Sequence, residues 1–267
     1  MSTNILATIV AQKFKEVAER KKQISLAQLE AMPLFAQNSF SLKANLKNPS
    51  ITNIIAEFKR KSPSKGIIHA TASVQEVTNA YAQYGAAGIS VLTDMDFFGG
   101  SLEDLSTAVK NEVPVLRKEF IIDEFQIIEA KAFGASVILL IASCLSAAAT
   151  QSLATCAKEL GMEVLLELHD ETELDHICEA VDFVGVNNRS LKSFEVNIEH
   201  ALKLRTLLPK NKLSIAESGI YDLATYQLLK KEGFDGFLMG EYFMKQANPA
   251  KAFEAFATAV KTEKDAV

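Results

Sequence analysis

The chain of 267 residues has no tryptophan, few cysteines and histidines, and no apolar run near the roughly 20 residues of a membrane-spanning helix. Its three cysteines, Cys144, Cys156 and Cys178, form no CxxC pair, and their odd number suits a reducing compartment. His176 lies close to Cys178, but no second pair follows at zinc spacing, so no metal site is predicted. The N-terminal segment lacks the features of a signal peptide, and we therefore expect a cytoplasmic protein.

Charge and composition exclude several classes of protein. The 28 basic and 33 acidic residues give a net charge of -5, which argues against a broadly basic nucleic-acid surface. A hydrophobic content of 48% and a charged content of 23% are ordinary for a globular protein and exclude a disordered chain, a collagen and a coiled-coil rod. We expect no nucleic-acid or membrane partner, and a monomer or weak oligomer.

The first 48 or so residues differ from the rest because they contain helix signals and no strand signal. Ile5, Ile9, Phe14 and Val17 recur at steps of three to five residues, which predicts an amphipathic helix. A second helix, SLAQLEAM, is predicted to begin after Ser25 as its N-cap and to end before the next proline. We expect residues 1–48 to form a helical extension that covers the catalytic face.

From residue 53 onward, short apolar runs alternate with helix-like stretches, several of which end in glycine. The starts of successive runs lie 20 to 35 residues apart (residues 163 and 183 are the closest pair, 53 and 88 the most distant). This alternation fits either a closed barrel or an open doubly wound sheet. No GxGxxG loop follows the first run, and the number of runs matches a barrel. The sequence therefore predicts an α/β fold, a single (β/α)8 TIM barrel over residues 1–267, with strands in the runs 53–58, 88–93, 113–118, 136–142, 163–168, 183–187, 213–218 and 235–240.

Alternation along these strands predicts which side chains face the barrel axis. In the first strand Ile54, Ala56 and Phe58 suit the helix layer, so Glu57 and Lys59 face inward. An ion pair at the barrel rim is the structural alternative for these two. The same parity places further polar groups at the same end of other strands, where barrel enzymes build their sites, and burying so many charges is costly without a function. The inward groups on these strands are Lys118, Glu167, Asn187, Arg189 and Glu217.

A second group of residues indicates anion binding. The run KRKSPSKG, which contains Ser62, follows the first strand, and on its own it also fits a solvated charged loop. Ser218 and Gly219 follow the seventh strand and Gly240 ends the eighth, where loops of this fold usually bind phosphate. Arg189 offers a charged fork for such an anion. The sequence therefore predicts a phosphorylated small-molecule substrate.

Two aromatic residues lie at the same end of the predicted barrel. Phe98 follows the second strand, and Phe120 follows Lys118 by two positions. Both also fit an ordinary core, but together they would form a pocket for a planar ring in the substrate.

Seven motifs, taken in order, resemble the indole-3-glycerol-phosphate synthase family: EFKRKSPSKG, LTDMDFFGGS, PVLRKEFI, LLELHDE, GVNNRSL, AESGI and LMGE. The resemblance covers the barrel and extends to the helical prelude. It implies a lyase of tryptophan biosynthesis that closes the pyrrole ring of 1-(2-carboxyphenylamino)-1-deoxyribulose 5-phosphate, releasing carbon dioxide and water. It also implies that no cofactor or metal is used.

The resemblance gives a role to each matched residue. Lys118 matches the general acid for ring closure, Glu167 a second acid–base group, and Lys59 a lysine that holds anionic groups and has a possible second proton-transfer role. Orienting roles fall to Glu57, Asn187, Glu217 and Ser218, phosphate binding to Ser62, Arg189, Gly219 and Gly240, and the aromatic pocket to Phe98 and Phe120. Glu241 departs from the pattern, since some members have serine there, and its carboxylate is unhelpful to a phosphate if the side chain points inward.

Two alternatives remain beside this reading, and one expectation about Lys118 follows from it. Phosphoribosylanthranilate isomerase is disfavoured because that family has a cysteine where this chain has Glu57. A non-catalytic phospho-sugar binder would not need Lys118 together with Glu167.

We expect neighbouring cations and burial to lower the pKa of Lys118, and Arg117 and Glu119 to point away from the axis.

Overall fold

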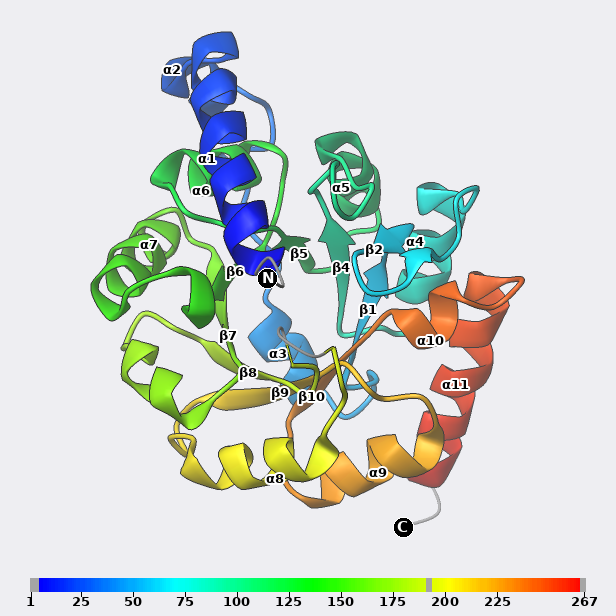
Figure 1. Ribbon diagram of the computed structural model, residues 1–267. Coiled ribbons are helices and arrows are strands. Elements are labelled where there is room, and N and C mark those ends of the chain that lie inside the picture. Colours follow the sequence, from blue (N-terminus) through cyan, green and yellow to red (C-terminus); the bar gives the residue numbers. More distant parts are fainter. Residues whose placement is uncertain (1–4, 191–193, 265–267) are drawn as a thin grey trace.

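The computed structural model describes residues 5–190 and 194–264, which leaves Leu191 of the GVNNRSL motif and residues 1–4 outside the description. Eight parallel strands close into a barrel in chain order, with the last paired to the first (Figure 1). The predicted (β/α)8 fold is confirmed, and every strand lies within its predicted run. The strands are β1 (Ile54–Phe58), β4 (Gly88–Leu92), β5 (Val115–Lys118), β6 (Val137–Ile141), β7 (Glu163–Leu168), β8 (Phe183–Asn187), β9 (Leu213–Glu217) and β10 (Gly236–Met239).

Side chains alternate between the barrel interior and the surrounding helices, as predicted. Ile55, Leu116, Leu165 and Ile215 come from different strands and pack together in one buried cluster inside the barrel. Residues of the opposite parity, such as Ile54, pack in the larger cluster beneath the helices. Because the parity is set in the buried part of each strand, it also fixes which polar groups face the axis at the strand ends.

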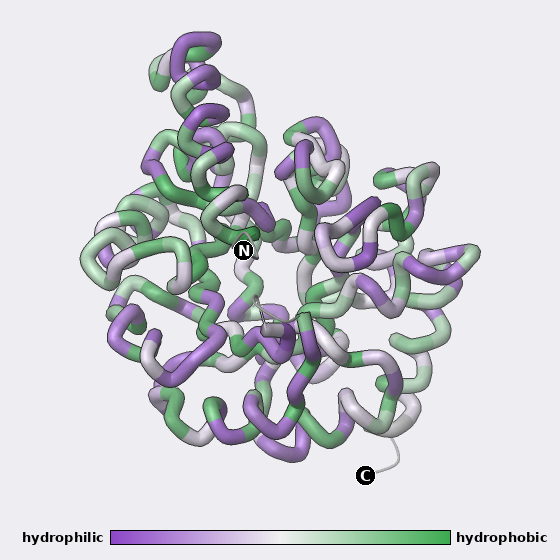
Figure 2. Tube along the Cα trace, viewed as in Figure 1, coloured by the Kyte–Doolittle hydropathy of each residue, from purple (hydrophilic) through white to green (hydrophobic). Residues whose placement is uncertain are grey.

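The outer layer consists of helices that follow the strands, and hydrophobic and hydrophilic residues alternate along many of them (Figure 2). The helices are α4 (Val74–Gln83), α5 (Leu102–Val109), α6 (Glu124–Ala132), α7 (Ala147–Glu159), α8 (Ile198–Leu207), α9 (Leu223–Lys231), the short α10 (Glu241–Met244) and α11 (Pro249–Lys264). Gly85, Gly134, Gly161 and Gly233 have φ between 70° and 90°, which confirms the predicted glycine ends.

Two connections differ from the regular pattern. Between β7 and β8, where the strand starts are closest in sequence, the 3-10 helix η2 (Glu171–His176) takes the place of an α-helix; another 3-10 turn, η1 (Ala142–Cys144), follows β6. After β1, the basic run folds into a small antiparallel hairpin of β2 (Lys61–Ser62) and β3 (Gly66–Ile67). The hairpin turns this run back over the mouth of the barrel, which the sequence did not predict.

The N-terminal extension contains α1 (Ile5–Gln23), α2 (Leu26–Glu30) and α3 (Leu42–Lys47). Ser25 is the N-cap of α2, as predicted, and it also forms a capping box with Gln28. The predicted apolar face of α1 is wrong at one position, since Phe14 is 60% exposed. Its neighbour Lys13 is buried instead, because carboxylates from the barrel surround its ammonium group.

Helix α3 lies at the end of the barrel where the strands begin, and it is seen through the centre of Figure 1. Leu42 and Leu46 contact the first residues of β4 and β10 and belong to the interior cluster. Glu163, at the start of β7, accepts hydrogen bonds from the backbone N–H groups of Leu42 and Lys43. The prediction that the whole extension covers the catalytic face is therefore corrected: α3 plugs the far end, because its two leucines complete the barrel core.

Three further features concern membranes, metals and cysteines within residues 5–190 and 194–264. No helix there is long and apolar enough to cross a membrane. No group of three or more His, Cys, Asp or Glu side chains in these ranges is arranged to hold a metal ion. Cys144, Cys156 and Cys178 are free thiols and only partly buried.

Candidate active site

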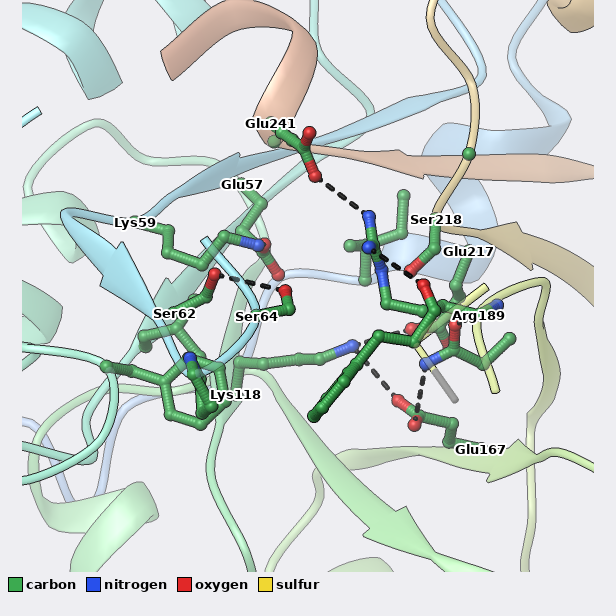
Figure 3. Close-up of a pocket in the computed structure, with 18 of the residues that line it drawn as sticks. Glu57, Lys59, Ser62, Ser64, Lys118, Glu167, Arg189, Glu217, Ser218 and Glu241 are labelled. Carbon is green, nitrogen blue, oxygen red and sulfur yellow. Dashed lines mark hydrogen bonds and ion pairs between the residues drawn. The ribbon is translucent and has the colours of Figure 1, made fainter. Parts of the chain in front are cut away.

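One pocket at the C-terminal ends of the strands contains every residue that the sequence assigned to the site. Figure 3 shows part of it, with Glu57, Lys118 and Glu217 among the labelled residues. Five different strands contribute polar side chains from their ends to this pocket, among them Glu57 on β1, Lys118 on β5 and Glu217 on β9. The loops after the strands supply the rest. The predicted residues that line this pocket are Glu57, Lys59, Ser62, Phe98, Lys118, Phe120, Glu167, Asn187, Arg189, Glu217, Ser218, Gly219, Gly240 and Glu241.

Lys118 lies at the centre of the polar groups. Its Nζ is 2.6 Å from Glu217 Oε2 and 3.2 Å from Glu167 Oε2 (Figure 3). Burial opposes the charged form, but the carboxylates of Glu217, Glu167 and Glu57 outweigh it and raise the pKa of Lys118 well above its ordinary value. The expectation of a lowered pKa was therefore wrong, because the neighbours are acids and not cations. Lys118 enters the site as an ammonium group that carries a proton to donate.

The two carboxylates that hold Lys118 have pKa values that are shifted in opposite directions. Burial alone would raise the pKa of Glu167, but Lys118, His169 and Asn187 favour its ionised form and lower that pKa well below the usual range. For Glu217 burial dominates, and with the charge of Glu167 nearby it raises the pKa to about 7 despite Lys118. Neighbouring acids whose pKa values are pushed apart are typical of acid–base sites.

Glu57 and Lys59 form an ion pair at the mouth of β1, with Lys59 Nζ 2.6 Å from Glu57 Oε1. Burial opposes ionisation of Glu57, but Lys59 and then Lys118 lower its pKa. A methyl group on Gly240 would lie 2.8 Å from both Cβ and Oε1 of Glu57. Glycine is therefore required at the end of β10 to leave room for Glu57, in addition to any ligand.

Arg189 is held by a neighbouring acid at the edge of the pocket. Its Nη2 donates to Glu241 Oε2 at 2.8 Å and to the hydroxyl of Tyr221 at 3.0 Å. Lys65 Nζ lies 3.7 Å from the other oxygen of Glu241. The side chain of Glu241 therefore points inward, and its carboxylate takes the place on Arg189 that an anionic ligand would need.

The loop after β9 has an unusual backbone conformation. Ser218 has φ of 65°, although it carries a side chain, and Gly219 follows with φ of 74°. The Ser218 carbonyl accepts a hydrogen bond from Asn188 Nδ2 at 2.7 Å, which helps to hold this turn. A methyl group on Gly219 would lie 2.3 Å from Val196, so glycine is needed here for space as well as for conformation.

The apolar side of the pocket is formed by Phe98, Phe120 and α1. The two rings are 5.9 Å apart between centroids and tilted by 40°. Ile5, Leu6 and Ile9 from the first turns of α1 line the same pocket. The start of the extension therefore contributes directly to the pocket wall, next to the aromatic rings.

The sequence analysis missed several polar residues of the site, among them Tyr221, which lines the pocket, and His169, which lies next to Glu167. His169 Nε2 lies 3.2 Å from Glu167 Oε1, and this pairing raises the pKa of the imidazole although burial acts against it. His169 comes two positions after Glu167, so the alternation that placed Glu167 inward would have found it. Arg117 and Glu119 point away from the axis, as expected, with Arg117 Nη2 bound to Glu129 on α6.

Fold and site together define a class of protein. It is a (β/α)8 barrel with a buried lysine–carboxylate cluster, in a pocket that has aromatic rings on one side and cationic side chains on the other. Three solved structures share this fold and only the fold, at 12–14% sequence identity. Tryptophan synthase subunit alpha from Legionella pneumophila str. Paris has a TM-score of 0.60, covering 85% of this chain and 98% of that chain. KGPDC from Streptococcus mutans has a TM-score of 0.57 (78% and 97% covered). Thiamine phosphate pyrophosphorylase from Pyrococcus furiosus has a TM-score of 0.56 (79% and 95%).

Sequence comparison is more specific. The family model described as "Indole-3-glycerol phosphate synthase" matches residues 6–256. The protein of that name from Bacteroides thetaiotaomicron is 44% identical over 259 residues, which is 97% of this chain and 99% of the relative. Its namesake from Acinetobacter baylyi is 40% identical over 258 residues, 95% of each chain. The chain belongs to the indole-3-glycerol phosphate synthase family, which confirms the resemblance drawn from the seven motifs.

Proposed function

We propose that this chain closes the indole ring of 1-(2-carboxyphenylamino)-1-deoxyribulose 5-phosphate to give indole-3-glycerol phosphate, carbon dioxide and water. Family membership supports the reaction, and the position of Lys118 between Glu167 and Glu217 is the observation that carries its chemistry. The substrate has an aromatic ring at one end and a phosphate at the other, and the pocket offers matching surfaces at its two sides.

The substrate is oriented by these two surfaces. Phe98 and Phe120 receive the anthranilate ring, and the loops that carry Ser62, Gly219 and Gly240 receive the phosphate. Arg189 supplies the charge for the phosphate after Glu241 moves away from it, because the two anions compete for the same guanidinium group. The ketone of the substrate then lies between the two ends, above Lys118.

Ring closure follows from proton donation by Lys118. Its ammonium group donates a proton to the ketone oxygen, and the ring carbon that bears the carboxylate attacks the ketone carbon to form the new bond. The carbon–carboxylate bond breaks next, carbon dioxide leaves, and the electron pair restores the aromatic ring. Lys59, whose Nζ lies at the pocket mouth beside Glu57, holds the carboxylate of the substrate until carbon dioxide leaves.

Dehydration needs a second proton donor and a base. The hydroxyl group formed from the ketone leaves as water after it takes a proton from Lys59, and Glu167 removes a proton from the ring system to complete the pyrrole. Glu167 suits the base because Lys118, His169 and Asn187 keep it ionised. Asn187 Nδ2 donates to Glu167 Oε1 at 3.0 Å and so fixes the direction of the carboxylate.

The direct test is to incubate the purified chain with the carboxyphenylamino deoxyribulose phosphate and to follow indole fluorescence. The expected result is product formation with release of carbon dioxide in equal amount. Binding of the substrate without turnover would support the phospho-sugar binder instead. Turnover of phosphoribosylanthranilate and not of this substrate would support the isomerase.

A further inference from the structure

A buried lysine on α1 is outside the pocket and has no part in the reaction described above. The side chain of Lys13 is 3% exposed, and its Nζ lies 2.6 Å from Glu16, 2.9 Å from Asp94 and 3.0 Å from Glu119. Asp94 follows β4 and Glu119 follows β5, and both carboxylates are as buried as the lysine. Burial opposes the charge, yet Glu119 and Asp94 raise the pKa of Lys13, so it stays charged at neutral pH.

The same face of α1 makes a second ionic contact two turns later. Arg20 Nη2 lies 2.8 Å from Glu129 on α6, and the other oxygen of Glu129 is bound by Arg117. Arg117 Nε donates a hydrogen bond to the hydroxyl of Thr93, and this hydroxyl donates in turn to Glu119 Oε2 at 2.7 Å. A continuous chain of hydrogen bonds and ion pairs thus connects the two cations of α1 through α6, β5 and the loop after β4. The position of α1 is therefore fixed by specific contacts with the barrel and not by apolar packing alone.

Two of the three carboxylates that hold Lys13, those of Asp94 and Glu119, also accept hydrogen bonds from the backbone of the aromatic residues. Asp94 Oδ1 accepts from the N–H groups of Phe97 at 2.7 Å and Phe98 at 3.1 Å, while Oδ2 binds Lys13. Glu119 Oε1 accepts from the N–H group of Phe120 at 2.9 Å. One ammonium group thus sits between the two carboxylates that set the two ring positions. Without it, the two buried carboxylates would lose the cation that lies between them and would repel, although Thr93 and Arg117 still contact Glu119.

We propose that Lys13 is a positioning residue for the aromatic half of the pocket. By neutralising Asp94 and Glu119 it holds the backbone of Phe98 and Phe120 at the separation that receives the substrate ring. The same contact couples the docking of α1 to ring binding, because Ile5, Leu6 and Ile9 enter the pocket on the same helix. The use of the rings for substrate rests on the proposed function; their positioning by Lys13 does not.

The test compares Lys13→Met with Lys21→Met. Lys21 is on the same helix and pairs with Asp123 at 2.7 Å, but its side chain is 46% exposed, so it controls for loss of an ion pair from α1. In Lys13→Met the KM should rise about tenfold or more with a much smaller change in kcat, since the proton donors are untouched. Amide hydrogen exchange measured by NMR should become at least about tenfold faster than in the wild type at Phe97, Phe98 and Phe120. The barrel strands should not show this increase. Lys21→Met should match the wild type in both measurements.

A second variant guards against misfolding, and two outcomes overturn the proposal. If Lys13→Met does not fold, the double variant Lys13→Met with Glu119→Gln is used instead. It removes one of the two buried negative charges and keeps an oxygen that can accept from the Phe120 N–H. The double variant should show the fast exchange at Phe97 and Phe98. Exchange and KM equal to those of Lys21→Met would overturn the proposal. So would a uniform increase of exchange in all strands with unchanged KM, because Lys13 would then only stabilise the barrel. The exchange measurement needs no substrate, so it decides this proposal even if the wild type forms no product, a result that overturns the proposed function alone.

Discussion

Replacing Lys118 with alanine tests the centre of the proposed chemistry. A positioned general acid contributes about 10²- to 10⁴-fold to the rate, so kcat should fall by at least about 10². The KM should change much less, because the phosphate and the ring are bound by other residues. Lys118→Arg should not restore the rate, since a planar guanidinium group cannot place a proton where the compact ammonium group of Lys118 lies between Glu167 and Glu217.

The same substitution has a consequence for stability that the structure makes specific. Lys118 lies between Glu167 and Glu217, and removing one partner of a buried ion pair costs about 3–5 kcal/mol. Glu217, whose pKa burial already raises to about 7, then binds a proton more readily in the folded than in the unfolded state. Its contribution to stability is therefore fully present below the unfolded pKa of about 4.5 and is lost as the pH rises through its raised folded value. In Lys118→Ala the deficit in the free energy of unfolding should thus be largest above pH 7 and shrink as the solution is acidified.

The assay is steady-state fluorescence of the indole product, run well below the melting temperature of each variant, with Lys59→Ala as the comparison. Lys59 holds anionic groups as well as donating a proton, so its loss should raise the KM clearly. The assignment of Lys118 as the acid is refuted if Lys118→Ala keeps a near-normal kcat and only its KM rises. Denaturant titrations at several pH values check the stability argument separately from the kinetics.

Three other predictions concern the phosphate side, the plug and the pH profile. Arg189→Ala should weaken substrate binding by about 1.5–3 kcal/mol, whereas Glu241→Gln should tighten it because the competing charge is gone; isothermal titration with unreactive substrate analogues checks both. Leu42→Ala should lower the free energy of unfolding by about 2–5 kcal/mol in urea titrations while the KM stays unchanged, since Leu42 is 1% exposed at the far end of the barrel. The kcat/KM of the wild type should change with an apparent pKa near 7, and this transition should be absent in Glu217→Gln, because the raised pKa of Glu217 is its source; an unchanged profile in the variant would contradict the assignment.

Local rules were sufficient for the strands and for the inward residues. Alternation in β1 and β9 is decided by buried neighbours such as Ile55 and Ile215, so the direction of Glu57 and Glu217 follows from the sequence alone. The glycine ends of the helices and the Ser25 cap are also local features. For this reason the fold, and the set of residues that meet in the pocket, could be predicted from the order of the amino acids.

What the sequence did not predict depends on contacts between distant segments. Lys13 is buried because Asp94, 81 positions later, reaches it, and no helical pattern contains that information. The pKa of Lys118 is raised and not lowered because of the distances to three carboxylates from other strands. The inward direction of Glu241 likewise follows from its pairing with Arg189, which belongs to a different loop.

The plug formed by α3 has a consequence for the order in which the barrel assembles. The ribosome makes Leu42 and Leu46 before any strand exists, so these leucines have no interior to enter at first. Their helix is anchored through Ser41, Leu42 and Lys43 to Glu163, which is synthesised only after β1, β4, β5 and β6. The apolar side of the N-terminal segment therefore stays uncovered until more than half of the polypeptide has been synthesised. During that interval the nascent chain exposes an apolar surface that a chaperone or a neighbouring nascent chain can bind. Burial of Leu46 is complete only when β10 closes the barrel, because Leu46 contacts Gly236 at the start of that strand.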